Sequence, residues 1–481
     1  MKTHSATRLL SSDLCAAAVA IILFNSGCGG HANQPSSHQI TKSADPADPL
    51  AWVLALHDGE GRLDEEIRRC QAQLRAGSYH LSPAQGGEGR GDGGGFGSHR
   101  FQEPEIALER LGWLFVAKAR ESFDPGFYRL AEQCAVCLDS RKPGSPEAML
   151  LRGHALQNQH RFKEAEPLAR GLVRRRGLPF DYGLLGDVLM EQGQLVEATD
   201  AYQMMIDLRP DLHSYARGAH LRWLKGDLTG AEQLMHLAAS ASSPLDPESA
   251  AWVHTRLAFY LLQEGAPNKA DRVCDQALEF QKDYPPALLL RGRIRLAQRN
   301  GAKAIEALQV AAKRSPLPEY QWALAEALRQ EDRADEAEEV ESQLRKTGAA
   351  NDPRTYALYL ATCGNSATTA LRLAQQELKQ RADVLTYDAL AWSLAAAGKI
   401  EEAQLQMEKA LAEGTKDGRL YFHAAVIAAK SGQAENARLW FEKASEYIQL
   451  LLPSEQQQLR DAGRRGIPKH QKPMGQKETH V

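Results

Sequence analysis

The sequence predicts an all-α fold in which about ten helical hairpins stack into a solenoid. Three observations carry this prediction. Ala, Leu, Glu, Gln and Arg, which favour helix, dominate from about residue 101 onward. Aromatic residues make up 7% of the chain and β-branched runs are scarce, so a sheet has little material. An alanine also recurs at a nearly constant interval, which indicates repeated units rather than separate globular domains.

The recurring alanines set the period of the repeat. They follow one another at steps of 34, 33, 33, 39, 34, 33, 33, 33 and 34 residues, and they are Ala131, Ala165, Ala198, Ala231, Ala270, Ala304, Ala337, Ala370, Ala403 and Ala437. A second small residue stands twelve positions before most of them. Because twelve residues cover one helix, a turn and the entry into the next helix, such a pair lets two antiparallel helices approach closely. The pairs are Gly153/Ala165, Gly186/Ala198, Ala219/Ala231, Ala258/Ala270, Gly292/Ala304, Ala325/Ala337, Ala391/Ala403 and Ala425/Ala437.

Helix-ending residues divide the repeats. Glycines lie between the two helices of a pair, where a left-handed helix cap favours glycine: Gly193, Gly226, Gly265, Gly398 and Gly432. Prolines stand where hairpins meet, because proline cannot continue a helix: Pro179, Pro210, Pro285, Pro316 and Pro353. We therefore expect the solenoid to span residues 101–451. Two members should be irregular, one with an insertion after Gly112 and one at 352–383, where Leu358 replaces the small residue.

The best-formed unit runs from Tyr182 to Pro210 (YGLLGDVLMEQGQLVEATDAYQMMIDLRP). It resembles the tetratricopeptide repeat family, with matching residues at Tyr182, Leu185, Gly186, Leu189, Gly193, Ala198, Tyr202 and Pro210. The stretches Asp388 to Ala410 and Tyr421 to Ala444 resemble it nearly as closely. The resemblance implies a right-handed superhelix whose concave surface is lined by the first helix of each hairpin.

The N-terminus is typical of a bacterial export signal. Lys2, His4 and Arg8 precede an apolar run from Leu14 to Phe24, which at eleven residues is shorter than the roughly 20 needed to span a bilayer. Residues 1–28 therefore read as a signal peptide. Small residues before Cys28 resemble the lipobox of bacterial lipoproteins, although Asn25 stands where that family has leucine. The resemblance implies acylation of Cys28 and, from Gly29, anchoring in the outer membrane. Ordinary cleavage with release into the periplasm or beyond, and an uncleaved signal, remain open.

The remaining segments are read from their composition. Residues 29–49 are polar and contain Pro and Ser, which predicts a flexible tether. Residues 50–77 show a short helical pattern. Residues 78–100 predict a linker, because eight of the twelve residues from 86 to 97 are glycine. Residues 452–481 are locally basic and lack apolar periodicity, so a disordered tail is expected, with a binding arm as the alternative.

The chain lacks the spaced motifs of common enzymes. It has no His-Glu-x-x-His, Gly-x-Ser-x-Gly, phosphate-binding loop or dinucleotide fingerprint, so we expect neither an enzyme nor a bound cofactor or metal. Cys134 and Cys137 form a CxxC, for which buried helical thiols and redox chemistry are the two interpretations. A net charge of -3 gives no electrostatic basis for nucleic-acid binding.

Aromatic and arginine side chains in the middle repeats suggest a binding groove. Residues that face away from the small-residue seam of the first helices are Arg217, His220, Trp223, Trp252, Arg256, Phe259, Arg293 and Trp322, with Trp392 farther along. Trp and Arg dominate binding energy at protein interfaces. We therefore predict a groove between residues 212 and 330 that holds a partner segment. The alternative is that these side chains fill the core between hairpins.

Together these features predict an exported, non-catalytic scaffold that binds protein partners at the cell envelope, with no role for nucleic acid. The alternative is an accessory or regulatory subunit of an envelope enzyme complex or of a secretion or pilus assembly machine. A hydrolase with an unrecognised site comes third.

Overall fold

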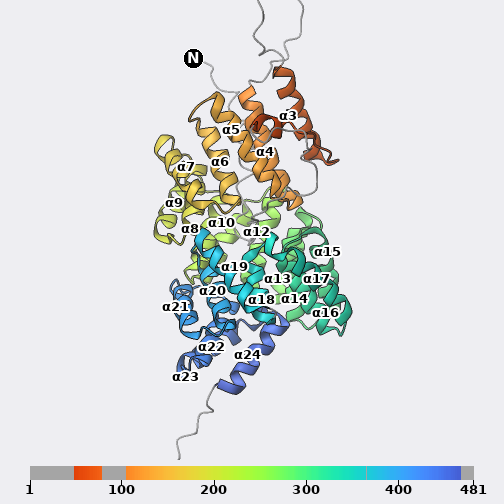
Figure 1. Cartoon of the computed structure of the whole chain (residues 1–481), viewed down its shortest axis with the longest axis vertical. Helices are drawn as coiled ribbons and strands as arrows, with labels where there is room; N and C mark the ends of the chain where they lie inside the picture. The colour runs from red at the N-terminus through yellow and green to blue at the C-terminus, as the bar shows by residue number, and fades with distance from the viewer. Residues whose placement is uncertain (1–47, 79–103, 365, 467–481) are drawn as a thin grey trace, which may run out of the picture.

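The computed structural model describes residues 48–78, 104–364 and 366–466, and these residues form helices joined by turns (Figure 1). The central body is a run of ten helical hairpins, which confirms the predicted all-α solenoid. Their first and second helices are α4/α5 (Pro104–Ser122, Gly126–Arg141), α6/α7 (Pro146–Asn158, Phe162–Arg175), α8/α9 (Pro179–Glu191, Leu195–Leu208), α10/α11 (Leu212–Leu224, Leu228–Ser240), α12/α13 (Pro247–Gln263, Pro267–Phe280), α14/α15 (Pro285–Ala297, Gly301–Arg314), α16/α17 (Pro318–Gln330, Ala334–Asn351), α18/α19 (Pro353–Cys363, Ala367–Gln380), α20/α21 (Val384–Ala396, Ile400–Leu411) and α22/α23 (Gly418–Lys430, Ala434–Glu446).

The small-residue pairs form the seam of each hairpin, as the spacing predicts. Ala198 and Ala304 are fully buried. A Cβ added at Gly186 would lie 2.4 Å from the Tyr202 ring, and one at Gly292 would lie 2.4 Å from the Leu308 side chain. Because such distances are far below van der Waals contact, only glycine at these two positions allows α8 to pack this closely on α9, and α14 on α15.

The turns inside the hairpins adopt the predicted left-handed conformation. The five expected glycines have φ between 75° and 78°: Gly193, Gly226, Gly265, Gly398 and Gly432. The same position of three other hairpins holds a non-glycine residue, His160, Arg299 or Asp332, with φ of 57° to 58°. A left-handed helix end is therefore imposed by the repeat even where glycine is absent.

The two irregular hairpins differ from expectation. The predicted insertion after Gly112 is wrong, because α4 is one continuous helix of 19 residues whose buried Ala119 stands twelve positions before Ala131. The hairpin α18/α19 forms in spite of Leu358, whose side chain is buried. The long step of 39 residues arises in part because α12 extends to 17 residues.

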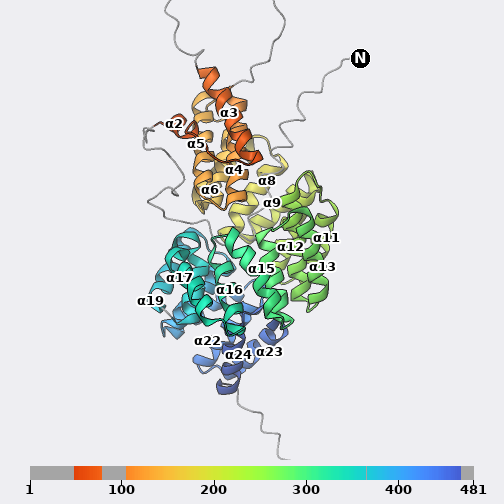
Figure 2. The same ribbon diagram turned by 90° about the vertical axis from the view of Figure 1, so that its right-hand side faces the viewer.

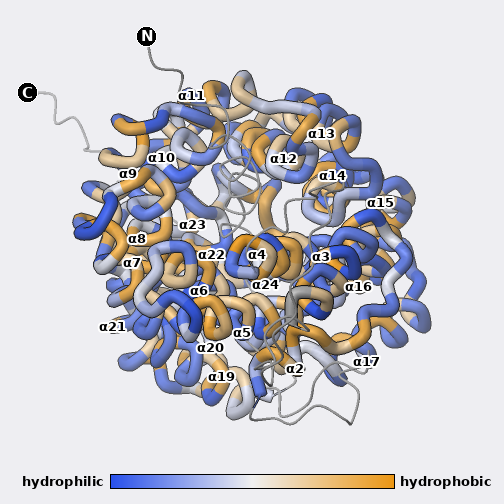
Figure 3. Tube along the Cα trace, turned by 90° about the horizontal axis from the view of Figure 1, so that it is seen from above, coloured by the Kyte–Doolittle hydropathy of each residue, from blue (hydrophilic) through white to orange (hydrophobic). Residues whose placement is uncertain are grey.

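The solenoid curls so tightly that residues far apart in sequence touch. The amide of Ala382 donates a hydrogen bond of 3.1 Å to the carbonyl of Glu191. Lys225 forms a 3.0 Å ion pair with Glu413, which lies 188 residues later. Viewed down the long axis, the hairpins form a ring with α4 and α24 (Pro453–Gly466) near its middle (Figure 3). The views at right angles place α4 toward one end and α24 toward the other (Figures 1 and 2).

Both ends of the solenoid extend beyond the predicted limits. The segment predicted at 50–77 forms α2 (Pro49–Val53) and α3 (Arg62–Ser78), which pack on α4 and α5. Asp64 fixes them through contacts of 2.6 Å to His57 and 2.9 Å to Lys118.

The predicted disordered tail is wrong for residues 453–466, which form helix α24, preceded by the short 3-10 helix η2 (Ile448–Leu450). The predicted signal peptide 1–28 with Cys28, most of the tether 29–49, most of the linker 78–100 and residues 467–481 lie outside the described residues. In the part that is described, no helix is both long and apolar enough to cross a membrane.

Buried neutral histidines make stability depend on pH. Burial lowers the pKa of His154 to about 3 and that of His213 to about 4, with help from the nearby Arg217 guanidinium. The unfolded chain binds protons below its ordinary histidine pKa, near 6.5, whereas the folded chain does not. The stability that these residues contribute is therefore complete above pH 6.5 and is lost as the pH falls.

We expect His154→Leu to flatten this dependence. Between pH 7 and pH 5 the wild type should lose about 2 kcal/mol more unfolding free energy than the variant, because each proton excluded costs about 1.4 kcal/mol per pH unit. Urea titrations at the two pH values measure this difference. His236→Leu is the control, since the His236 side chain is 57% exposed. An identical pH slope for wild type and His154→Leu would contradict the prediction.

Candidate functional site

The structure buries the side chains predicted to line a groove at 212–330. Trp252 and Trp322 are no more than 1% exposed, and Arg217, His220, Trp223, Arg256 and Phe259 are no more than 8% exposed. Arg293 is 12% exposed and forms a 2.6 Å ion pair with Glu319. The alternative interpretation, core packing, describes these eight residues. The prediction of an open groove here is corrected, because a partner cannot reach these side chains in this conformation.

The chain itself covers this surface. Trp223 donates a hydrogen bond of 2.8 Å to Gln263, and Gln263 donates one of 3.0 Å to the carbonyl of Lys416 in the turn between α21 and α22. Gln449 of η2 donates one of 3.1 Å to the carbonyl of Leu262. The inner faces of α10 and α12 are thus covered by residues 150 to 190 positions later. The Arg256 guanidinium lies 4.9 to 5.4 Å from the ring centres of three aromatic residues, Trp223, Phe259 and Tyr260.

Arg217 has a defined structural role in this core. Its guanidinium donates hydrogen bonds of 2.8 and 2.7 Å to the two carboxylate oxygens of Asp187, and both side chains are at most 5% exposed. Tyr202 donates a further hydrogen bond of 2.8 Å to Asp187. Arg217 therefore belongs to a buried bidentate ion pair, which is a strong structural contact.

An open concave pocket exists instead at the C-terminal end of the solenoid. Its volume is about 480 Å³, and it lies between α24 and the first helices of the last three hairpins. The apolar floor and the polar rim together consist of Ala361 of α18, Trp392 and Ala396 of α20, Val426, Ala429 and Lys430 of α22, and Gln458, Asp461 and Ala462 of α24. An apolar floor with a few charged groups at its edge is the usual composition of a binding pocket.

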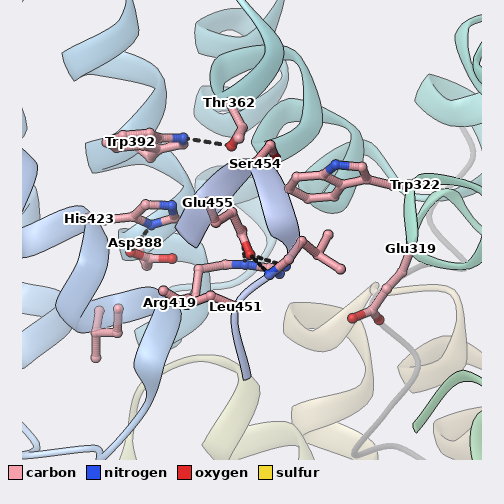
Figure 4. A network of polar contacts seen from close by, with 12 residues as sticks. Glu319, Trp322, Thr362, Asp388, Trp392, Arg419, His423, Leu451, Ser454 and Glu455 are labelled. Atoms are coloured by element: carbon pink, nitrogen blue, oxygen red, sulfur yellow. Dashed lines mark hydrogen bonds and ion pairs between the residues drawn. The ribbon is translucent and has the colours of Figure 1, made fainter. Parts of the chain in front are cut away.

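A hydrogen-bonded network holds the floor of the pocket rigid (Figure 4). Trp392 donates a hydrogen bond of 3.0 Å to Thr362, and the His423 ring stacks on its face with the ring centres 4.2 Å apart. His423 Nδ1 lies 2.8 Å from an oxygen of Asp388, and both side chains are at most 5% exposed. Trp392 is fixed on both sides and is itself only 4% exposed, so a small part of its indole forms the preformed apolar base of the pocket.

Helix α24 supplies the opposite wall and is anchored by polar contacts. Arg419 donates a hydrogen bond of 2.6 Å to Glu455, and its guanidinium lies 5.0 Å from the centre of the Trp322 ring. The amide of Ser454 donates one of 2.9 Å to Glu326 of α16. Gln458 donates one of 2.8 Å to the carbonyl of Thr362. Figure 4 shows Ser454 and Glu455 between His423 of α22 and Trp322 of α16.

The arrangement offers contacts for binding and no obvious chemistry. Burial raises the pKa of the Cys137 thiol to about 11 and that of Cys134 well above its ordinary value, so both CxxC thiols stay protonated at neutral pH. Among residues 48–78, 104–364 and 366–466, no three His, Cys, Asp or Glu side chains come together in a way that could hold a metal ion.

Comparison with known families identifies the repeat. A model of the tetratricopeptide repeat matches residues 150–213, 289–353 and 389–449. These three stretches, which make up less than half of the chain, match the tetratricopeptide repeat. The third match covers most of α20 and all of α22, two of the four helices that line the pocket. Trp392 and Val426 each stand directly after the small residue of their repeat, Ala391 and Ala425. The repeat spacing could therefore find this position, and it did mark Trp392; Lys430 and the residues of α24 carry no repeat signal.

Several solved structures match this chain at low identity and with TM-scores below 0.5. PilF of Pseudomonas aeruginosa is 15% identical, with a TM-score of 0.37, and the match covers 42% of this chain and 90% of that one. A human IFIT1 dimer with m7Gppp-AAAA is 15% identical, with a TM-score of 0.45, and covers 73% of this chain and 78% of that one. A tetratricopeptide repeat protein from Parabacteroides merdae is 18% identical, with a TM-score of 0.30, covering 53% and 97%. A search of curated proteins finds no match.

Proposed function

We propose that this tetratricopeptide protein is a non-catalytic scaffold of the cell envelope that binds a partner protein in the concave pocket of its last three hairpins. The pocket itself carries the proposal, because its indole floor is preformed and its rim bears the exposed Lys430 and the half-buried Asp461. Such a combination gives an apolar anchor site surrounded by groups that select for charge. The repeats at 212–330, whose inner faces are closed, then serve as the framework.

The location of the scaffold rests on the sequence alone. The signal-like residues 1–28 and Cys28 support export and acylation, and the polar residues 29–47 would separate an acylated Cys28 from the helical body. One lipid chain binds a membrane only marginally, so stable anchoring requires the several acyl chains that lipoproteins carry.

Affinity capture from detergent-solubilised membranes tests both parts of this proposal. Wild type should retain partner protein, and Lys430→Glu should lose at least nine-tenths of it, because the reversed charge repels the groups that match the rim. Lys399→Glu is the matched control, since Lys399 is also exposed but lies outside the pocket. Cys28→Ser should lose acyl label and leave the membrane fraction while keeping the partner.

Two outcomes would contradict the proposal. Equal capture by wild type and Lys430→Glu would remove the pocket from the binding surface. Acyl label retained by Cys28→Ser would exclude Cys28 as the anchor.

A further inference from the structure

Helix α24 lies in the concave groove in the way that a bound peptide would. Its first two turns contact the first helices of three hairpins: Ser454 bonds Glu326 of α16, Gln458 bonds the Thr362 carbonyl of α18, and Glu455 bonds Arg419 of α22. Ser454 and Glu326 are 128 positions apart in the sequence, and Gln458 and Thr362 are 96 positions apart. The groove is therefore already occupied by a segment of its own chain.

The occupant is poorly matched to the groove beneath it. The helix reads PSEQQQLRDAGRRG, and Leu459, at 1% exposure, is its one large apolar side chain. Over the pocket α24 presents Gln458, Asp461 and Ala462, which are polar or small. The space left open is about 480 Å³, roughly three times the volume of an apolar cavity of about 150 Å³ that admits benzene. Because this space is open to solvent, its apolar lining stays in contact with water, and a larger apolar side chain placed there would remove that surface from water.

The first turn of α24 carries a charge that is complementary to the groove. Glu455 is fully buried, accepts a hydrogen bond of 2.6 Å from Arg419, and accepts a second of 2.8 Å from the amide of Leu452. Arg419 is 18% exposed and lies over Trp322, so without Glu455 it would be left with little solvent and no carboxylate at this position. Any replacement for α24 must therefore bring an acidic residue to Arg419.

We propose that α24 is a replaceable, autoinhibitory occupant, and that the partner inserts an amphipathic helix in its place. The incoming helix carries an acidic residue in its first turn for Arg419 and a large aliphatic or aromatic residue seven positions later, where α24 has Ala462. The acidic residue supplies the same ion pair, and the apolar side chain fills the pocket over Trp392. This inference rests on the proposed function, because it names the kind of partner that the pocket accepts.

A synthetic peptide tests the exchange. The probe is a fluorescein-labelled copy of residues 452–466 with Ala462→Leu, and its anisotropy is followed with the full-length protein. Glu455→Gln in the protein weakens α24 and should tighten peptide binding at least tenfold relative to wild type. Ala462→Leu in the protein fills the pocket from within and should weaken peptide binding at least tenfold. Arg460→Ala, a change at an exposed position of α24, should leave the affinity unaltered. A probe that also carries Glu455→Gln should bind none of the proteins.

Hydrogen exchange provides the second measurement, and it does not depend on any variant. With wild type at saturating peptide, the amides of residues 453–466 in the protein should lose protection while those of α22 keep theirs. Equal affinity of the peptide for wild type, Glu455→Gln and Ala462→Leu would overturn the inference, as would unchanged protection of residues 453–466. If Lys430→Glu still loses the captured partner while the peptide fails to bind, the proposed function stands and the helical replacement of α24 is wrong.

Discussion

Trp252→Ala should lower the free energy of unfolding by about 3–5 kcal/mol, the range for removing a large aromatic side chain from a core. Trp252 is fully buried in α12, where it belongs to the hydrophobic core. Because the surrounding helices are fixed by their own small-residue seams, they cannot collapse onto the vacated space. Urea unfolding followed by far-UV circular dichroism measures the loss.

A control and a contrary result make the test decisive. Leu245→Ala removes an apolar side chain that is 96% exposed and should change the unfolding free energy by less than about 0.5 kcal/mol. Unaltered stability of Trp252→Ala together with loss of a captured partner would restore the groove that the sequence predicted at 212–330. A large loss of stability assigns Trp252 to the core and leaves the pocket at Trp392 as the candidate binding site.

Arg381→Ala should destabilise the closed superhelix by about 3–5 kcal/mol, because removing one partner leaves buried charges uncompensated. The Arg381 side chain is 2% exposed and lies 3.1 Å from Glu377, 3.6 Å from Glu191 and 3.9 Å from Asp383. Burial raises the pKa of Glu191 to about 7, and the Arg381 guanidinium opposes that rise. Without the guanidinium, Glu377 and Glu191 would lose their ion-pair partner at the contact between α8 and the turn from α19 to α20, whereas Asp383 would keep its 3.1 Å pair with Arg354.

Hydrogen exchange can separate local opening from global unfolding in this variant. The amide of Ala382, which bonds the carbonyl of Glu191 across the contact, should lose protection before the hairpin seams do. Lys399→Ala is the control, because its pair with Glu402 is about half exposed on both sides and surface pairs contribute at most about 1 kcal/mol. Protection of Ala382 equal to wild type would show that Arg381 does not hold the turns together.

The features that the sequence predicted correctly are local ones. The seam at Gly186 and Ala198 could be located because twelve residues on one chain fix which side chains meet in a hairpin. The turn at Gly193 could be located because a helix ends in the same conformation at each repeat. Burial of Trp252 and Trp322 could not be decided in this way, because an inward-facing position on a first helix is open or closed depending on the width of the superhelix.

The contacts that decide the candidate site are distant ones. Gln263 bonds Lys416, and Ser454 bonds Glu326, across more than a hundred residues of sequence. The repeat period marks none of these pairs. Helix α24 is a polar sequence with a single buried leucine, so its composition resembles a disordered tail. It forms a helix in the folded protein, where Arg419 and Glu326 of the groove provide its polar partners.

The sequence by itself thus determined the repeat, its period, its seams and its turns, since each depends on residues within one hairpin. The tertiary structure decided which part of the concave surface is open. Small rotations between hairpins add up along the solenoid, and their sum brings α8, α10 and α12 against the C-terminal hairpins while leaving the pocket at Trp392 accessible. Ten hairpins meet at nine interfaces, so this sum cannot be predicted from any one repeat.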